Sequence, residues 1–249
     1  MQKLQSNQLH LIKSLFESYS SNRAIIFSVF EGWFNGCAYV NDINNTKWAL
    51  LQTPFLQNFI AGEPIAGCED VVSDILFNSI LSGLDEKELV AFSDTDKWND
   101  ILDSIFQKRN GVSDGRKIFK FSRENYESVS RASIPEGLAV VVEKRKATPF
   151  SLRDTLSAKL IINGHTVSFC NACMIGDNKA ELDVFTDEAF RGRGYAFLSA
   201  TLLIDELLNE GLTPTWSTWP FRKESQRVAE KLGFIPQPDA KAWIWQEGM

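Results

Sequence analysis

The chain has 249 residues, of which 44% are hydrophobic and 23% charged, and its net charge at pH 7 is −6. This length allows one large domain or two small ones, each with a buried core. Because no surplus of Lys and Arg is available to neutralise phosphates, the composition argues against a nucleic-acid-binding protein.

The N-terminal sequence predicts no targeting or membrane segment. Residues 1–15 are polar and amphipathic and lack the apolar stretch of a signal peptide. The longest apolar run, residues 24–30, has the length of a strand and is far too short to span a membrane. We therefore expect a cytoplasmic protein without a membrane partner.

The four cysteines are expected to be reduced, since nothing in the sequence indicates secretion. Cys170 and Cys173 have the spacing of half a zinc or redox site. No second pair accompanies them, and residues three apart on a strand point to opposite faces. We expect core or edge cysteines and no metal.

The first half, residues 1–123, is expected to form a mixed α/β domain. Its periodicity predicts helices over 4–19, 70–81 and 95–107 and strands over 24–30, 37–40 and 47–52. The polar stretch 108–116 predicts an exposed crossing between the halves. This half is expected to wall a substrate cleft. A degenerate copy of the second half is an alternative, although no internal sequence repeat supports it.

The second half, residues 124–249, begins with strand-like runs and then alternates helix and strand. Asn163-Gly164 joins two β-prone runs, a strong hairpin signal because both residues tolerate positive φ. The predicted strands cover 137–143, 159–163, 165–175, 180–186, 214–219 and 242–245. Helical patterns cover 196–208 and 224–232, and the first ends at Gly211.

Between the strand 180–186 and the helix that follows stands Arg191-Gly192-Arg193-Gly194-Tyr195-Ala196. A glycine-rich turn that opens a helix presents free backbone N–H groups at the positive end of the helix dipole, which suits an anion such as pyrophosphate. Gly192 and Gly194 allow the close approach of phosphate oxygens, and Arg191 and Arg193 add positive charge. The spacing matches neither a Walker loop nor a dinucleotide-binding fingerprint.

This hexapeptide resembles the coenzyme-binding signature of the GNAT acetyltransferases, Gln/Arg-x-x-Gly-x-Gly/Ala. The run from Ser225 to Gly233-Phe234 resembles the second motif of that family, and the two motifs stand in the expected order. The resemblance covers the chain from about Ala158 onward. Within the superfamily, the sequence around these motifs is most similar to that of the two-part enzymes typified by the zwittermicin A resistance protein.

The resemblance implies an α/β (α+β) fold, with a mixed, mostly antiparallel twisted sheet flanked by helices in the second half. It also implies acetyl-CoA as co-substrate, held by the loop residues 191–196, namely Arg191, Gly192, Arg193, Gly194, Tyr195 and Ala196. The backbone of Val184, Phe185 and Thr186 is expected to hold the pantetheine arm and to stabilise the oxyanion. Ordinary strand pairing of those three residues is the other interpretation.

Glu181 is the candidate general base, because it lies on the strand that precedes the loop and a buried carboxylate can accept the proton of an amine. A structural carboxylate hydrogen-bonded to a neighbouring strand is an equal alternative. The tyrosine acid common in the family is missing, since Ala229 occupies its position, and Arg222 replaces a frequent Asn. Ser225 is the candidate that contacts the coenzyme sulfur region, or else a helix cap.

The sequence therefore predicts an acetyl-CoA-dependent N-acetyltransferase that acts on a primary amine of a small molecule. A coenzyme-binding regulatory module with little turnover is the alternative. The identity of the acceptor and the oligomeric state do not follow from the sequence.

Overall fold

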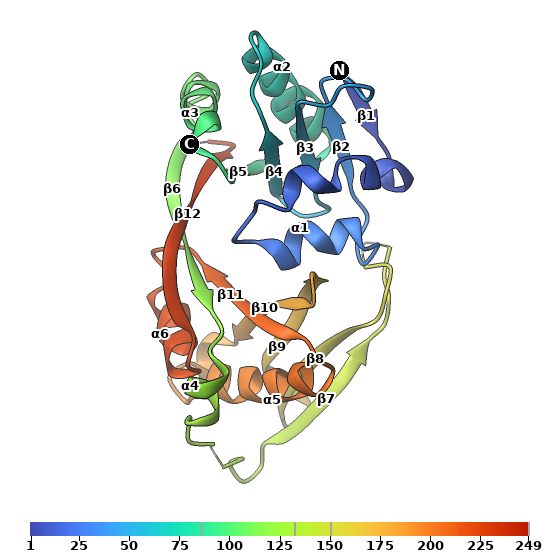
Figure 1. The fold of residues 1–249 in the computed structure, drawn as a ribbon. Helices are drawn as coiled ribbons and strands as arrows, with labels where there is room; N and C mark the ends of the chain where they lie inside the picture. The colour runs from blue at the N-terminus through green and yellow to red at the C-terminus, as the bar shows by residue number, and fades with distance from the viewer. Residues whose placement is uncertain (86, 132, 150, 249) are drawn as a thin grey trace. The chain divides into compact units, whose positions relative to one another are not determined.

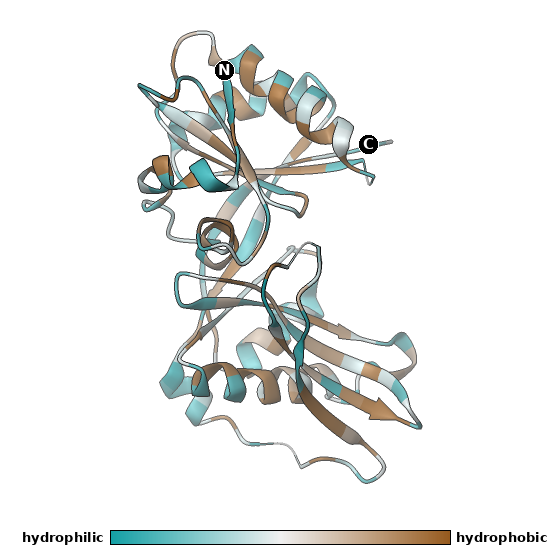
Figure 2. Ribbon diagram, turned by 90° about the vertical axis from the view of Figure 1, so that its right-hand side faces the viewer, coloured by the Kyte–Doolittle hydropathy of each residue, from teal (hydrophilic) through white to brown (hydrophobic). Residues whose placement is uncertain are grey.

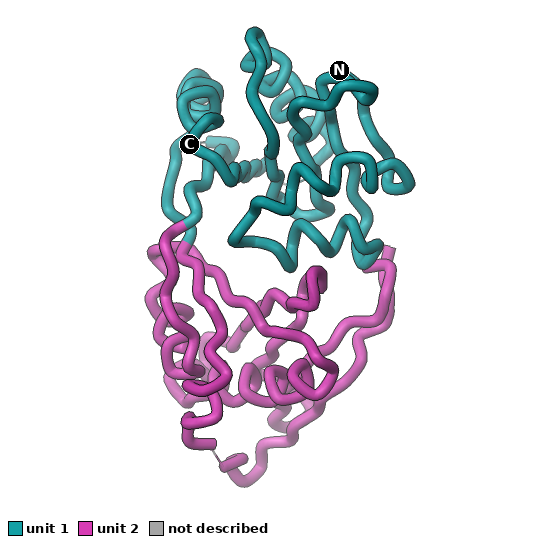
Figure 3. The backbone as a smooth tube through the Cα atoms, in the orientation of Figure 1, with its two compact units in different colours: residues 1–116, 240–249 teal, residues 117–239 magenta. Residues whose placement is uncertain are grey.

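The computed structural model describes residues 1–248 except 86, 132 and 150, and the chain divides into two compact units (Figure 3). Unit 1 comprises residues 1–116 and 240–249, and unit 2 comprises residues 117–239. Apolar stretches run along the strands of both units (Figure 2). In the described part of the chain, no helix is long and apolar enough to cross a membrane.

Unit 1 is a sheet with helices, and its strand order is β1-β2-β3-β4-β5-β12. Neighbouring strands are antiparallel except β4 and β5, which are parallel. The strands are β1 (Gln2–Leu4), β2 (Cys37–Val40), β3 (Trp48–Gln52), β4 (Gln57–Gly62), β5 (Glu88–Ser93) and the end of β12 (Ile235–Gln246). The helices are α1 (Arg23–Phe30), α2 (Cys68–Asp74), extended by a π-helical turn (Ile75–Ile80), and α3 (Asn99–Gln107), with short 3₁₀ turns between them.

The core of unit 1 contains three almost fully buried tryptophans, Trp48, Trp98 and Trp243. Trp243 comes from β12, and its indole Nε1 donates to Asp103 Oδ1 of α3 at 2.7 Å. The closing strand predicted over 242–245 is present within β12, and Trp243 packs in the core of unit 1.

Two predictions for the first thirty residues are wrong. The run 24–30 forms the helix α1, not a strand, and residues 24–29 are all buried. A short apolar run has no periodicity that separates a buried strand from a buried helix. The predicted helix 4–19 is instead the strand β1 followed by two 3₁₀ helices, Ser6–Leu11 and Lys13–Phe16.

Unit 2 has the strand order β6-β11-β10-β9-β8-β7, and the parallel pair is β10 with β11. Its strands are β6 (Val112–Lys120), β7 (Ala139–Arg145), β8 (Thr155–Ile162), β9 (His165–Gly176), β10 (Lys179–Thr186) and β11 (Thr213–Thr218). Its helices are α4 (Arg123–Glu127), α5 (Tyr195–Asn209) and α6 (Lys223–Lys231) (Figure 1). At the predicted hairpin, Asn163 and Gly164 both have positive φ, at 48° and 80°.

The region 108–116, predicted as an exposed crossing, is partly strand. The chain turns at Asn110, which has a φ of 60°, and β6 then begins at Val112. Further along β6, Lys117, Ile118 and Phe119 pair with β11. The second half of this stretch is therefore strand, although its composition resembles that of a loop.

The two units repeat one topology. In each, four antiparallel strands lead into a helix, a parallel strand and a second helix: β4, α2, β5 and α3 in unit 1 correspond to β10, α5, β11 and α6 in unit 2. In each, the strand that follows the second helix pairs in the other unit. β6 follows α3 and pairs with β11, whereas β12 follows α6 and pairs with β5. Each sheet is therefore completed by a strand from the other half of the sequence.

Candidate functional site

The helix α5 begins without a side-chain cap. Its N-cap residue is Gly194, which has a left-handed backbone with φ of 80°, and its first turn carries no acidic residue. Gly192 also has positive φ, at 77°, and a Cβ at either glycine would meet no atom within 4 Å. The first N–H groups of this 15-residue helix are therefore available to an anion, and open space lies beside both glycines.

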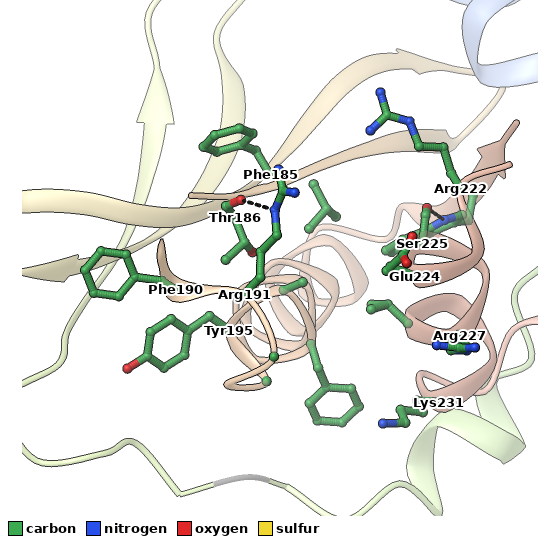
Figure 4. Close-up of a pocket in the computed structure, with 17 residues that line it drawn as sticks. Phe185, Thr186, Phe190, Arg191, Tyr195, Arg222, Glu224, Ser225, Arg227 and Lys231 are labelled. Carbon is green, nitrogen blue, oxygen red and sulfur yellow. Dashed lines mark hydrogen bonds between the residues drawn. The ribbon is translucent and has the colours of Figure 1, made fainter. Parts of the chain in front are cut away.

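A cavity of about 460 Å³ lies between the start of α5 and one side of α6 (Figure 4). It is lined by residues of β10, the loop, α5, β11 and α6. Every expected coenzyme contact except Arg193 lines it: Val184, Phe185, Thr186, Arg191, Gly192, Gly194, Tyr195 and Ala196. The side chain of Arg193 lies over the Phe190 ring, 5.2 Å from its centroid, and borders an adjacent hollow.

Basic side chains flank this cavity from two elements. Arg191 extends from the loop, and Figure 4 shows Arg222, Arg227 and Lys231 along α6. One carboxylate, Glu224, also lines the cavity. Four cations against one anion favour a polyanionic ligand.

The strands β10 and β11 separate beside the cavity. They pair only from Lys179 to Glu181 of β10, opposite residues 213–215 of β11. From Leu182 to Thr186, β10 continues to pair with β9, and no β11 partner is found among the described residues. This leaves one edge of the predicted oxyanion and pantetheine segment, Val184 to Thr186, without a strand neighbour.

Glu181 lies at the last paired position before this separation. Its side chain is buried, and both carboxylate oxygens accept hydrogen bonds from β11. The donors are the hydroxyl of Thr215, at 2.6 Å, and the hydroxyl of Ser217, at 2.5 Å. Glu181 does not line the cavity that holds the loop residues. The structure thus supplies the hydrogen bonds that the structural interpretation requires.

Two further ionisable groups lie on this part of the sheet. Desolvation raises the pKa of Asp183, although a hydrogen bond from Asn171 and the charge of Arg145 lower it in part. Burial raises the pKa of the Cys170 thiol well above its usual value. Cys170 is therefore a neutral core residue and not a nucleophile. Among the described residues, the four cysteines form no disulfide and no metal-ligand cluster is found.

Ser225 lies in the first turn of α6 and lines the cavity. The N-cap of α6 is Arg222, and no side chain caps this helix, so Ser225 is not the cap. Its hydroxyl oxygen accepts a hydrogen bond from the indole Nε1 of Trp216 at 3.1 Å. Ala229, at the position of the missing tyrosine, is fully buried.

The sequence reasoning missed Arg227 and Lys231 as cavity residues, and Thr215 and Ser217 as partners of Glu181. Arg227 and Lys231 could have been predicted from the sequence, since two basic residues four apart share one helix face. Thr215 and Ser217 could not, because their contact with Glu181 depends on how β10 and β11 align in the sheet.

Comparison with known proteins identifies the architecture. Residues 150–242 match the family model of the GNAT acetyltransferases. This segment therefore resembles a GNAT acetyltransferase domain. A Bacillus subtilis protein named as an uncharacterised N-acetyltransferase, YdfB, is 24% identical in an alignment of 255 positions. The alignment covers 94% of each chain.

Solved GNAT structures resemble the whole chain and not this domain alone. A GCN5-related N-acetyltransferase-like protein from Streptococcus suis superposes with a TM-score of 0.70 at 19% identity, covering 97% of this chain and 100% of its own. A tandem GNAT protein from the clavulanic acid biosynthesis pathway gives a TM-score of 0.63 at 10% identity and covers 98% and 95%. The expected α/β fold class is confirmed, and so is the expected enzyme class, a GNAT N-acetyltransferase.

Proposed function

We propose that the GNAT domain transfers the acetyl group of acetyl-CoA to a primary amine of a small molecule. The observation that carries this proposal is the uncapped start of α5, which opens with two left-handed glycines beside a cavity lined by four cations. The diphosphate of a coenzyme matches this combination of free N–H groups, open space and positive charge.

The residues that would hold acetyl-CoA are those of the loop and of the free edge of β10. Backbone N–H groups from Gly192 to Ala196 would bind the diphosphate, and Arg191 would add charge. The edge from Val184 to Thr186, which has no β11 partner, would hold the pantetheine arm by backbone hydrogen bonds. When bound, the coenzyme supplies an acetyl thioester. An N–H from the same edge would stabilise the negative charge that develops on the acetyl oxygen.

Glu181 is proposed as the base that takes the proton of the attacking amine. Its buried carboxylate stands where β10 and β11 begin to separate, and the hydroxyls of Thr215 and Ser217 hold it in one orientation. A fixed orientation is what general-base catalysis requires. Ser225 is proposed to act at the sulfur, from the facing side of the cavity.

We also propose that the N-terminal half is a degenerate GNAT-like domain. The repeated topology and the match of the full chain to a tandem GNAT protein support this. Gly67, at the start of α2, has positive φ as Gly194 does, but the first turn of α2 carries Glu69 and Asp70. Negative charge at that helix start disfavours a phosphate. We expect no second coenzyme site there.

The placement in the subgroup typified by the zwittermicin A resistance protein and the cytoplasmic location remain predictions. A regulatory module that binds the coenzyme without turnover is the alternative function. Ala229 in the tyrosine position is the feature that would suit such a module.

The direct test is release of CoA from acetyl-CoA by the full-length chain, measured against a panel of amines that includes amino acids, polyamines and aminated antibiotics. We expect release above the hydrolytic background with at least one small primary amine, together with its acetylated product by mass spectrometry. Tight coenzyme binding without turnover on any amine would support the module instead.

A further inference from the structure

The missing tyrosine raises the question of what stabilises the sulfur when the thioester breaks. In the proposed transfer a C–N bond forms as the C–S bond breaks, and the electron pair of the broken bond remains on sulfur. The amine gives its proton to Glu181, and water finally protonates the thiolate. A hydrogen-bond donor near the sulfur would lower the energy of that charge. Ala229 has no group that can do so.

Ser225 stands one helical turn before Ala229, on the same face of α6. Ser225 is half-buried at the cavity, whereas Ala229 is fully buried. A donor at residue 225 therefore reaches the cavity from the helix that carries the tyrosine position.

The contact with Trp216 determines what the Ser225 hydroxyl can do. An indole N–H can only donate, so the serine oxygen must accept in the 3.1 Å contact between Trp216 Nε1 and Ser225 Oγ. Among the described residues, this indole is the one hydrogen-bond partner of that hydroxyl. The serine proton is left for an acceptor inside the cavity.

Trp216 is itself held rigidly. It is 3% exposed, its backbone lies in β11 opposite Phe119, and its ring packs edge-on against Phe234 with centroids 5.7 Å apart. Phe234 belongs to the Gly-Phe end of the second motif. The contact with Phe234 therefore fixes the direction of the Trp216 indole N–H. The indole N–H in turn fixes the orientation of the Ser225 hydroxyl.

We propose that Trp216 is a positioning residue that holds Ser225 as a hydrogen-bond donor to the coenzyme thiolate, in place of a tyrosine. Ser225 keeps its own proton, because an aliphatic hydroxyl is a much weaker acid than a thiol. The inference rests on the proposed function, since it needs the coenzyme sulfur to lie beside α6.

The test is an ultraviolet titration of the thiol of CoA bound to the full-length protein, which detects the thiolate without turnover. The thiol of free CoA, titrated in the same buffer, is the reference. We expect a lower midpoint in the wild-type complex. Ser225→Ala and Trp216→Phe should each raise that midpoint by about one pH unit, a tenfold change in thiolate stability.

Three further variants separate this role from a structural one. The double variant, Ser225→Ala with Trp216→Phe, should have the same titration midpoint as Ser225→Ala alone, because Trp216 acts through Ser225. Ser225→Thr keeps a hydroxyl and should keep the low midpoint. Trp243→Phe loses an indole hydrogen bond to Asp103 in unit 1 and should leave the titration midpoint of the bound CoA thiol unchanged.

Equal midpoints in the wild type and Ser225→Ala would overturn the inference while leaving coenzyme binding intact. Absence of any CoA binding by the wild type would overturn the proposed function as well. A Trp216→Phe effect that persists in the Ser225→Ala background would show that Trp216 does not act through the serine.

Discussion

The hydrogen bonds of Glu181 are compatible with both of its interpretations. Its carboxylate is only 6% exposed, and each oxygen accepts a hydroxyl hydrogen bond from β11. These bonds stabilise the sheet at the point where β10 and β11 separate, and they would also fix the orientation of the proposed base. The two roles differ in what a substitution does to turnover.

Replacing Glu181 with Gln should lower turnover about 10²- to 10⁴-fold, since the amide cannot take a proton from the amine. The shape of the side chain is retained, so acetyl-CoA affinity should not change. Turnover at saturating coenzyme and calorimetric affinity measure the two effects separately.

Thr215→Val is the matched control for this experiment. It removes one of the two hydroxyl donors but leaves the carboxylate in place, at a cost of about 1–3 kcal/mol in the free energy of unfolding. We expect it to keep far more turnover than Glu181→Gln. Equal turnover in the two variants, per folded molecule, would show that Glu181 is structural.

At the scale of elements, the exchange of end strands ties the two halves of the chain together. The residues of β12 that pair with β5 run from Ala242 to Gln246, and they include the buried Trp243. A strand that completes a sheet from so far along the sequence makes the folding of unit 1 depend on the last residues of the chain.

Deleting residues 240–249 should therefore destabilise unit 1, although all of its other strands and helices remain. The loss of Trp243 alone corresponds to about 3–5 kcal/mol. We expect loss of a cooperative transition in denaturant unfolding, or hydrogen exchange of the amides of β5 at the rate of an unfolded chain. Deleting only residues 247–249 is the control and should leave β5 protected. Full protection of β5 in the longer deletion would contradict the strand exchange.

Two causes separate the features that the sequence predicts from those that it does not. The loop 191–196 and its flanking strand and helix are contiguous, so local glycine and hydrophobic patterns are enough to predict them. The sequence predicts a strand at α1 because the short run 24–30, apolar except for Ser28, has no helical periodicity. The exchange of β6 and β12 depends on pairing between distant residues, which no local pattern encodes.

For the molecule as a whole, we expect one coenzyme site per chain, although the topology occurs twice. The two helix starts at Gly67 and Gly194 share a left-handed backbone but differ in charge. The first turn of α2 is acidic, whereas basic side chains flank the cavity at the start of α5. Affinity for a polyanion should therefore belong to unit 2 alone.

The most direct test is a calorimetric titration with acetyl-CoA of the wild type, Gly194→Val and Gly164→Val. Both glycines have φ of 80° and open space around a Cβ, so both substitutions strain the backbone alike, but only Gly194 lies at the cavity. We expect one coenzyme per chain in the wild type and in Gly164→Val, and none in Gly194→Val. Undiminished binding by Gly194→Val would contradict this expectation.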